Sequence, residues 1–412
     1  MRAERDAEPS LLAALPPARR VVAHHGAAAD RDELAHRLAR LTATPAALYR
    51  LSIDAASPAD ALPVLALLSA AGRDDLVAFA AGAAGFWSRL VAPRLGAPAV
   101  FAPLAPVNGD AIAAARLVRD FDLPRLAPAS RLYAIAGQAS IHSRAPRLHN
   151  AALRRLGIDA LHVPLPVAAG GFEEAWRGLV EDGRLAALGL PLAGLIVTSP
   201  HKGRALDVAR LQRGVVARSQ AANYLVPVTG RDGRPAGWRA GSADPAGVLD
   251  NLRRLGATVA GARVALVGVG GTGRSAAAAL ERAGARVTLA NRSVDRGRRV
   301  AKSLGMPFVP LARLSLRGFD VLINATPLGR AGEEPPFAVE ELPAGGAVVD
   351  HVYGAGTTPL VARARARGLA VVDGNDVLYA QTRQHFQALT GRRFPFSRRE
   401  VADLLAEGEP TR

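Results

Sequence analysis

The strongest constraint on the fold is a glycine-rich turn at residues 268–273, which reads Gly-Val-Gly-Gly-Thr-Gly. It follows the apolar run VALV and opens the alanine-rich segment RSAAAALERAG. A strand that turns into a helix in this way is typical of a Rossmann unit, whose helix N-terminus faces a dinucleotide pyrophosphate. In such a turn Gly268 permits the tight bend, Gly270 admits the phosphates and Gly273 allows close helix–strand packing. We expect a nucleotide site here that includes Gly271; the alternative is a glycine-rich turn without a ligand.

The rest of the chain alternates short apolar runs with longer helical patterns, which predicts an α/β fold. Its 412 residues are enough for two or three domains. Residues 20–122 contain four strand–helix units, whose predicted strands are RVVAHH, ALYRLSI, LVAFAAG and AVFAPLA. Further strands are predicted at LYAIAG, AGLIV, RVALV, RVTLA, DVLIN, AVVDHVY and LAVVDG. A linker is expected at 123–130, and a boundary at Asp250 or in the turn after it.

Composition narrows the class of protein further. The chain is 49% hydrophobic and 21% charged, as globular proteins are, and has no long uncharged apolar run. The absence of cysteine excludes disulfides and thiolate chemistry and is compatible with a reducing cytoplasm. We therefore expect a soluble cytoplasmic protein with no membrane partner.

The net charge of +16 does not point to nucleic acid. The arginines are spread along the whole chain and aromatic residues make up only 5%, whereas nucleic-acid binders cluster charge or interleave it with stacking rings. Only two of the 52 basic residues are lysines, Lys202 and Lys302. Lysine chemistry is therefore confined to two positions.

The strand RVTLA after the glycine-rich turn ends in Asn291-Arg292-Ser293. An NAD site usually has an acidic residue here for the ribose 2′-hydroxyl, whereas arginine suits a 2′-phosphate. This favours NADP over NAD. Asp295 keeps open the alternative in which Arg292 is an ordinary surface arginine.

Lys202 closes the segment VTSPHK, directly after the predicted strand AGLIV. Ligands of open α/β sheets bind at the carboxyl ends of strands, so this lysine is a candidate catalytic group rather than a solvated charge. His142, His149 and His201 lie near such motifs, but their spacing is not that of a zinc site and no metal is expected.

Across residues 131–412 the sequence resembles the shikimate dehydrogenase family. The resemblance is carried, in order, by AIAGQASIHSRAPRLHN, VTSPHK, AANYLV, SADPAG, GVGGTG, NRS, NATPLG, VVDHVY with TTPL, and GNDVLYAQ. It implies a substrate-binding domain at 131–250, completed by the C-terminal helices 375–412, and a Rossmann NADP-binding domain at 251–374.

The resemblance implies reversible reduction of 3-dehydroshikimate to shikimate with NADPH. It assigns Lys202 as the catalytic lysine, Asp244 as its partner and Thr326 to the cofactor site. An ammonium beside the reacting oxygen can donate the proton while hydride reaches the carbonyl carbon. The positions that match substrate contacts of the family are Ser143, Thr198, Asn223, Tyr353 and Gln381.

Several positions depart from the family pattern. They are Ala145, Tyr224, Ser242, Ala243 and Ala355. Each lost hydrogen bond weakens binding by about 0.5–1.5 kcal/mol, while the proton-transfer pair is retained. An alternative is therefore a dehydrogenase whose substrate preference has drifted towards quinate or a related hydroxy acid. A second hypothesis is a catalytically weak nucleotide- and shikimate-binding regulatory protein.

Residues 20–120 resemble the second half of a type I 3-dehydroquinate dehydratase. The positions that match its histidine, imine-forming lysine, substrate-binding arginine and late glutamine are His25, Arg50, Arg89 and Asn108. Arginine stays protonated and cannot form an imine, so Schiff-base dehydration in this segment is excluded. The missing lysine and the missing half of the barrel argue against a bifunctional dehydratase–dehydrogenase. The resemblance predicts a half (β/α) barrel-like segment at 1–125, used for packing or homodimerisation. The competing view is that His25 and Arg89 still hold an anion.

Overall fold

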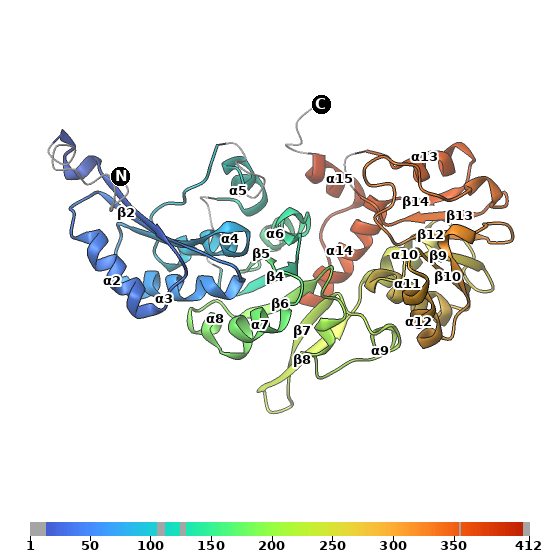
Figure 1. The fold of residues 1–412 in the computed structure, drawn as a ribbon, viewed down its shortest axis with the longest axis horizontal. Coiled ribbons are helices and arrows are strands. Elements are labelled where there is room, and N and C mark those ends of the chain that lie inside the picture. The colour runs from blue at the N-terminus through green and yellow to red at the C-terminus, as the bar shows by residue number, and fades with distance from the viewer. Residues whose placement is uncertain (1–13, 105–111, 124–128, 354–355, 407–412) are drawn as a thin grey trace. The chain divides into compact units, whose positions relative to one another are not determined.

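The computed structural model describes residues 14–104, 112–123, 129–353 and 356–406. The chain forms two compact units, Met1–His201 and Lys202–Arg412, and each is described by itself (Figure 1). Asn108 and Ala355 lie outside the described residues. In the described part of the chain, no helix is both long and apolar enough to cross a membrane.

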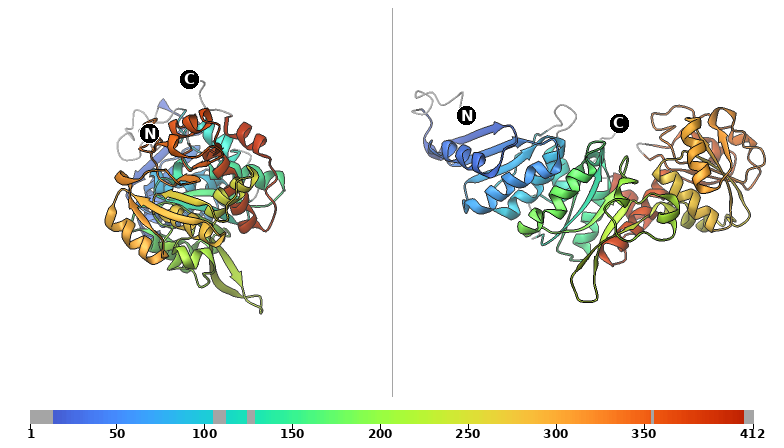
Figure 2. Two further views of the ribbon diagram at one scale, coloured as in Figure 1. Left: turned by 90° about the vertical axis from the view of Figure 1, so that its right-hand side faces the viewer. Right: turned by 60° about the horizontal axis from the view of Figure 1, so that its bottom comes forward.

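The first unit begins with a three-stranded parallel sheet, in the order β1-β2-β3. Its strands are β1 (Val21–Gly26), β2 (Leu48–Asp54) and β3 (Leu76–Ala81). Helices α2 (Arg31–Thr42) and α3 (Ala61–Ala71) pack against each other and run along the sheet (Figure 2). The first three predicted strands are confirmed.

The fourth strand predicted for this segment, AVFAPLA, does not form. The described residues 97–104 contain no strand. Pro98 and Pro103 lack the N–H groups that a ladder position needs, which explains the failure of this prediction. The chain continues from α4 (Gly82–Val91) to α5 (Ala114–Phe121) without a fourth strand in the described part.

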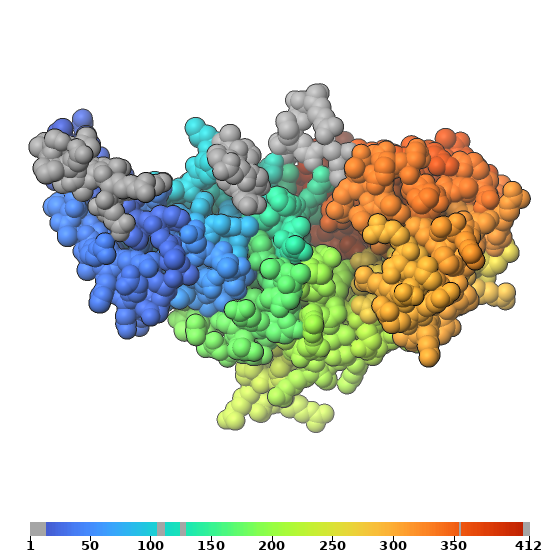
Figure 3. Space-filling model, viewed as in Figure 1, coloured from blue at the N-terminus to red at the C-terminus, as the bar shows by residue number. Residues whose placement is uncertain are grey.

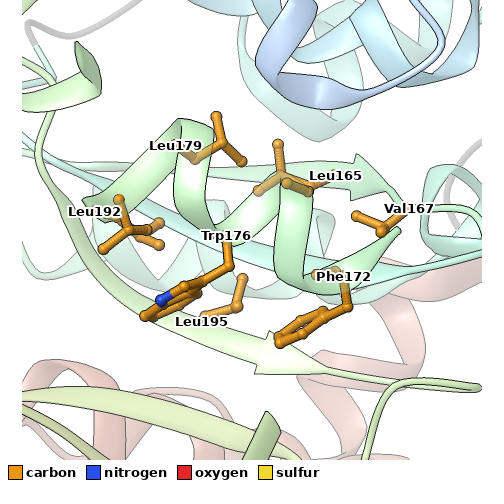
Figure 4. A pocket seen from close by; sticks show the side chains of 10 residues that line it. Leu165, Val167, Phe172, Trp176, Leu179, Leu192 and Leu195 are labelled. Carbon is orange, nitrogen blue, oxygen red and sulfur yellow. The ribbon is translucent and has the colours of Figure 1, made fainter. Parts of the chain in front are cut away.

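A second parallel arrangement in the same unit consists of β4, flanked by β5 and β6. Their bounds are β4 (Leu132–Gly137), β5 (Leu161–Pro166) and β6 (Leu192–Val197), with helices α6 (Ala145–Arg155), α7 (Phe172–Trp176) and α8 (Arg184–Ala187). Aromatic and leucine side chains from α7 and the following turn face the strands (Figure 4). They enclose an apolar cavity of about 20 Å³, which is too small for an organic substrate.

The N-terminal segment packs directly on this second arrangement. Helix α4 contacts β5, and α5 contacts α6. The Asp120 carboxylate, 3% exposed, is held by arginines from both helices: Arg116 Nε at 2.9 Å, Arg119 Nε at 2.8 Å and Arg147 Nε at 3.9 Å. The Asn150 amide donates to the Asp120 carbonyl at 3.1 Å. A buried carboxylate therefore joins α5 to α6.

The second unit contains a six-stranded parallel sheet in the order β11-β10-β9-β12-β13-β14, the doubly wound Rossmann arrangement. Its strands are β9 (Arg263–Val267), β10 (Arg286–Asn291), β11 (Phe308–Pro310), β12 (Val321–Asn324), β13 (Ala347–Asp350) and β14 (Ala370–Val372). Both faces are covered: Val264 and Leu266 belong to one buried cluster and Ala265 and Val267 to another. This explains why β9 is a continuous apolar run.

The helices of this unit are α9 (Val215–Ser219), α10 (Asp244–Arg254), α11 (Gly271–Arg282), α12 (Val294–Leu304), α13 (Pro359–Ala366), α14 (Gly374–Thr390) and α15 (Arg398–Ala406). An antiparallel hairpin, β7 (Tyr224–Thr229) and β8 (Pro235–Gly241), precedes α10. Its turn projects from the surface (Figure 3). Helix α10 runs through Asp250, and the three domain boundaries stay predictions.

We expect Asp120→Asn to lower the free energy of unfolding of the first unit by about 1–3 kcal/mol, because buried arginines lose their counter-charge. Urea unfolding followed by the fluorescence of the buried Trp87 and Trp176 measures this. Asp122→Asn is the matched control, since Asp122 has a left-handed backbone (φ 59°) that asparagine also adopts. Equal stability of the two variants would contradict the joining role of Asp120.

Candidate active site

The glycine-rich turn has the geometry that its sequence predicts. Gly268 has φ +102°, and a Cβ at Gly273 would lie 1.9 Å from the Gly268 carbonyl oxygen. A Cβ at Gly270 would meet no atom within 4 Å, so the space beside this backbone is open. Helix α11 then starts at Gly271 with no side-chain cap. Its first N–H groups can therefore bind a phosphate.

Lys202 lies against the start of this helix. Its Nζ donates to both carboxylate oxygens of Asp244, at 2.9 and 2.8 Å, and to Thr272 Oγ1 at 2.7 Å. Asp244 is 1% exposed and the Lys202 side chain 14%. A Cβ on Gly271 would come within 2.8 Å of the Lys202 Cβ, so glycine is what permits this approach. Three oxygen acceptors thus hold the ammonium at the glycine-rich turn.

Gln381 and Asn223 support the pair from two other elements. Gln381, on α14, donates from Nε2 to Asp244 Oδ1 at 2.9 Å. The buried Asn223 accepts from the Ala243 N–H at 2.7 Å, next to Asp244. Helices α10 and α14 pack together, which holds the Asp244 carboxylate next to the Gln381 amide. The structure therefore brings Lys202, Asp244, Gln381 and Asn223 together.

A second polar network lies at the ends of β12 and β13. Asn324 Oδ1 accepts from Thr326 Oγ1 at 2.6 Å, and Asn324 Nδ2 donates to Asp350 Oδ1 at 3.0 Å. Thr358 Oγ1 donates to Asp350 Oδ2 at 2.6 Å. Burial raises the pKa of Asp350, although these hydrogen bonds oppose the shift. The network fixes Thr326, whose methyl group would lie 2.7 Å from a Cβ on Gly268.

His351 is a residue that the sequence interpretation missed. It follows Asp350 at the carboxyl end of β13, and its ring Nε2 is buried without a hydrogen-bond partner among the described residues. Burial lowers its pKa to about 4; the charge of Asp244 opposes this shift and that of Lys202 adds to it. Its only sequence signal is its position inside VVDHVY. It places a neutral imidazole near the lysine–aspartate pair.

Arg274 and Arg296 also escaped the sequence interpretation. Arg274 lies in the first turn of α11, and its buried Nε has no hydrogen-bond partner in the described ranges. Burial and then the charge of Arg296, on α12, lower its pKa. Arg292 is exposed at the end of β10, where Asn291 Nδ2 donates to the Ser293 carbonyl at 2.9 Å. Three arginines therefore surround the carboxyl ends of β9 and β10.

The other predicted substrate residues are Tyr353, Ser143 and Thr198. Tyr353 is 39% exposed in the second unit. Ser143 and Thr198 belong to the first unit. Ser143 Oγ accepts from the Ala145 N–H at 3.1 Å, and the Thr198 N–H donates to the Ala136 carbonyl at 2.9 Å. Their roles stay predictions.

Two positions that depart from the family pattern, and two of the histidines near the motifs, make defined contacts. The Tyr224 ring occupies the space that a Cβ on Gly241 would need, and Ser242 Oγ accepts from the Asp244 N–H at 3.4 Å. His201 Nε2 lies 3.0 Å from the Val167 carbonyl, whereas the His149 ring packs 4.6 Å from that of His162. Within the described ranges, no three His, Asp or Glu side chains form a group able to hold a metal.

A doubly wound sheet holds its nucleotide at the carboxyl edge, and an amine fixed at the same edge can carry a proton to or from a substrate oxygen. Fold and site therefore define the class of Rossmann dehydrogenases. Family models match in three places: "Shikimate dehydrogenase substrate binding domain" at 135–225, "Shikimate / quinate 5-dehydrogenase" at 251–331 and "Type I 3-dehydroquinase" at 7–118.

Individual relatives narrow this class. A shikimate dehydrogenase (NADP(+)) of Acidiphilium cryptum is 37% identical over 265 residues, which are 64% of this chain and 91% of that protein. A second shikimate dehydrogenase (NADP(+)), from Rhodospirillum rubrum, is 39% identical, and the alignment covers 92% of that protein. The crystal structure of shikimate 5-dehydrogenase from Thermus thermophilus in complex with NADP(H) and shikimate aligns with a TM-score of 0.56 at 29% identity, covering 66% of this chain and 97% of that one. The chain belongs to the shikimate dehydrogenase family.

The lowered pKa of His351 predicts a pH dependence of stability. Unfolding returns its pKa from about 4 to about 6.5, so the unfolded chain binds more protons between these values. Stability should therefore fall as pH drops from 6.5 to 4, with a slope of up to about 1.4 kcal/mol per pH unit from this group. His351→Met should reduce this slope, measured by chemical unfolding followed through Trp238. His142→Met, at an exposed position, should not.

Proposed function

We propose that this chain is an NADP-dependent dehydrogenase that reversibly reduces 3-dehydroshikimate to shikimate. The observation that carries the proposal is the Lys202 ammonium, bound by Asp244 and Thr272 at the start of the helix that follows the glycine-rich turn. Membership of the shikimate dehydrogenase family supports the substrate class. A substrate panel of shikimate and quinate, each with NADP and NAD, tests the assignment directly.

The second unit fits a dinucleotide. The open space at Gly270, the uncapped start of α11 and the unpartnered Nε of Arg274 suit phosphate groups. Arg292 and Arg296 would hold the 2′-phosphate that distinguishes NADP from NAD. Arg292 is exposed at the end of β10 and therefore accessible to the phosphate. The nicotinamide, when bound, supplies the hydride.

The proton is handled by this chain's own residues. In the reducing direction the Lys202 ammonium gives one proton to the carbonyl oxygen as the carbonyl carbon receives hydride, and the product is the alcohol. In the oxidising direction the neutral amine takes the hydroxyl proton back. Asp244 fixes the amine with both oxygens, and Gln381 fixes Asp244. Because these contacts exist before substrate arrives, little reorganisation is needed at the reacting atoms.

We propose that the substrate hydroxyls and carboxylate are bound by Ser143, Thr198, Asn223, Tyr353 and Gln381. Hydroxyl and amide groups suit a polyhydroxylated acid, since each substrate hydroxyl requires a donor or an acceptor. Asn223 and Gln381 are already held beside Asp244. Ala145 offers no hydroxyl, so Ser143 carries that part of the site without a second serine.

The N-terminal segment serves packing in this proposal. Its helices α4 and α5 contact β5 and α6 of the same unit, and the buried Asp120 joins them. Imine chemistry is excluded because Arg50 occupies the position of the lysine in the family it resembles. Homodimerisation through this segment is part of the proposal, and the molecular mass of the full chain in solution tests it.

We expect Lys202→Ala to reduce kcat by about 100-fold or more, because the substitution removes the ammonium that donates the proton. Formation of NADPH from NADP and shikimate, followed by absorbance, measures the loss. Lys302→Ala replaces the only other lysine, which is exposed on α12, and should leave kcat unchanged. A Lys202→Ala enzyme that is folded by circular dichroism and retains kcat within a few-fold would refute the proposed mechanism.

Cofactor choice is tested at the arginines after β10. Arg292→Gln and Arg296→Gln each remove a charged hydrogen-bond donor, worth about 1.5–3 kcal/mol, so the KM for NADP should rise about 10- to 100-fold. The KM for NAD should not change, because NAD lacks the 2′-phosphate. Arg298→Gln, exposed on the same helix, is the control. Equal increases in the KM for NADP and in the KM for NAD would contradict a contact with the 2′-phosphate.

A further inference from the structure

A cavity of about 500 Å³ opens at the amino edge of the six-stranded sheet in the second unit. Its lining includes the first residue of β9, the first residues of β10, and the segments 305–307 and 317–319, which lead into β11 and β12. These four strands are neighbours in the sheet and run parallel. The cavity therefore lies at the opposite end of the strands from the glycine-rich turn. Its volume falls within the range of small-molecule pockets, about 300–1,000 Å³.

Two arginines stand side by side at this edge. Arg263 and Arg286 are register partners in β9 and β10, so their side chains leave the same face of the sheet. Arg263 is paired with Asp320, with 3.2 Å between Nη2 and Oδ1. Arg286 is exposed and forms no ion pair with a carboxylate among the described residues. Because neighbouring like charges repel each other, an anion on Arg286 would relieve an unfavourable contact.

The other charged side chains of the lining are neutralised. Glu281 accepts from Arg218, at 3.2 Å from Nε and 3.2 Å from Nη2. Arg317 donates from Nε to Glu341 at 3.3 Å. Within the described ranges, Arg286 is therefore the charged group of the lining that lacks a partner of opposite sign. The cavity carries one uncompensated positive charge.

The C-terminal end of α12 also borders this edge, and free helix carbonyls there would repel an anion. Arg218 occupies them: Nη1 donates to the Ser303 carbonyl at 3.0 Å, and Nη2 donates to the Leu304 carbonyl. The negative end of the helix is thus already bound by a cation. It does not cancel the charge of Arg286.

The remaining lining offers an apolar wall and a hydroxyl. Met306 and Phe319 line the cavity from the segments before β11 and β12. A thioether and a ring both make favourable contacts with an aromatic group. Thr288 lies two residues after Arg286 and therefore on the same face of β10. Its hydroxyl makes no hydrogen bond in the part of the chain that the structure describes.

We propose that this cavity binds a small aromatic monocarboxylate, with the carboxylate on Arg286 and Thr288 and the ring against Met306 and Phe319. A guanidinium fork matches the two oxygens of a carboxylate, and a hydroxyl adds a further donor. A single uncompensated cation favours a monoanion over a dianion. None of the side chains that we propose for cofactor binding and proton transfer lines this cavity, so it is a second site.

Methionine provides a reporter, because the chain contains only Met1 and Met306. The full chain, with isotope-labelled methionine methyl groups, is titrated with benzoate at constant ionic strength and observed by NMR. NADPH and shikimate occupy the proposed dehydrogenase site; both are reduced, so no hydride passes between them. We expect the Met306 methyl signal, identified by its loss in Met306→Leu, to shift and saturate, while the Met1 signal stays in place.

Variants of the two proposed donors locate the carboxylate. Arg286→Gln should weaken benzoate binding by about 10-fold or more, because it removes a charged donor. Thr288→Val keeps the shape but removes the hydroxyl, and should weaken binding by about 2- to 10-fold. Arg282→Gln is the matched control: it removes an exposed charge at the end of α11, outside the lining, and should bind as the parent does.

Two further probes separate the charge from the ring. Benzamide has the ring without the charge and acetate has the charge without the ring, so each should bind about 10-fold more weakly than benzoate. A Met306 signal that benzoate does not move, equal binding of benzamide, or unchanged binding in Arg286→Gln would overturn the proposal. These measurements need no turnover, so they hold whether or not the dehydrogenase assignment does.

Discussion

The buried ion pair between Lys202 and Asp244 is the interaction on which the site depends. An ammonium and a carboxylate are stable out of water only when their remaining hydrogen-bonding capacity is also satisfied, and here Thr272 and Gln381 do so. Each partner comes from a different element: the start of α10, the start of α11 and the middle of α14. The pair therefore requires three helices to keep their relative positions, and the packing of α10 against α11 and α14 provides this.

The doubly wound sheet explains why these helices begin where they do. Both faces of β9 are buried, and glycine at 268 and 273 lets the chain turn directly from the carboxyl end of this strand into α11. Helix α11 then presents unpaired N–H groups and Thr272 at the same edge. The groups that we propose for phosphate binding and for proton transfer are therefore neighbours because of the topology of the sheet. The Asn324–Asp350 contact stabilises the adjoining strand ends.

Local patterns predicted the strands well, but not the contacts between distant residues. The runs LYAIAG and RVALV coincide with β4 and β9, and the glycine spacing predicted the turn geometry. The fourth N-terminal strand was wrong because its prolines outweigh its apolar character. Lys202 was named from its position after a strand, whereas Asp244 and Gln381 were named only through the family resemblance, and the contact between these two spans 137 residues of sequence. His351 Nε2 and Arg274 Nε are buried without a hydrogen-bond partner among the described residues. Burial of this kind arises from tertiary packing, so a local sequence pattern does not predict it.

The arginine-rich composition has two different consequences within the first unit. At the contact between α5 and α6, Asp120 neutralises the surrounding guanidinium groups, and charge becomes part of the packing. On the β1–β3 sheet, the Arg50 and Arg89 guanidinium groups lie over the Phe101 and Phe79 rings, and no carboxylate among the described residues forms an ion pair with them. The same residue type thus contributes to packing through ion pairs at one contact and through aromatic rings at the other.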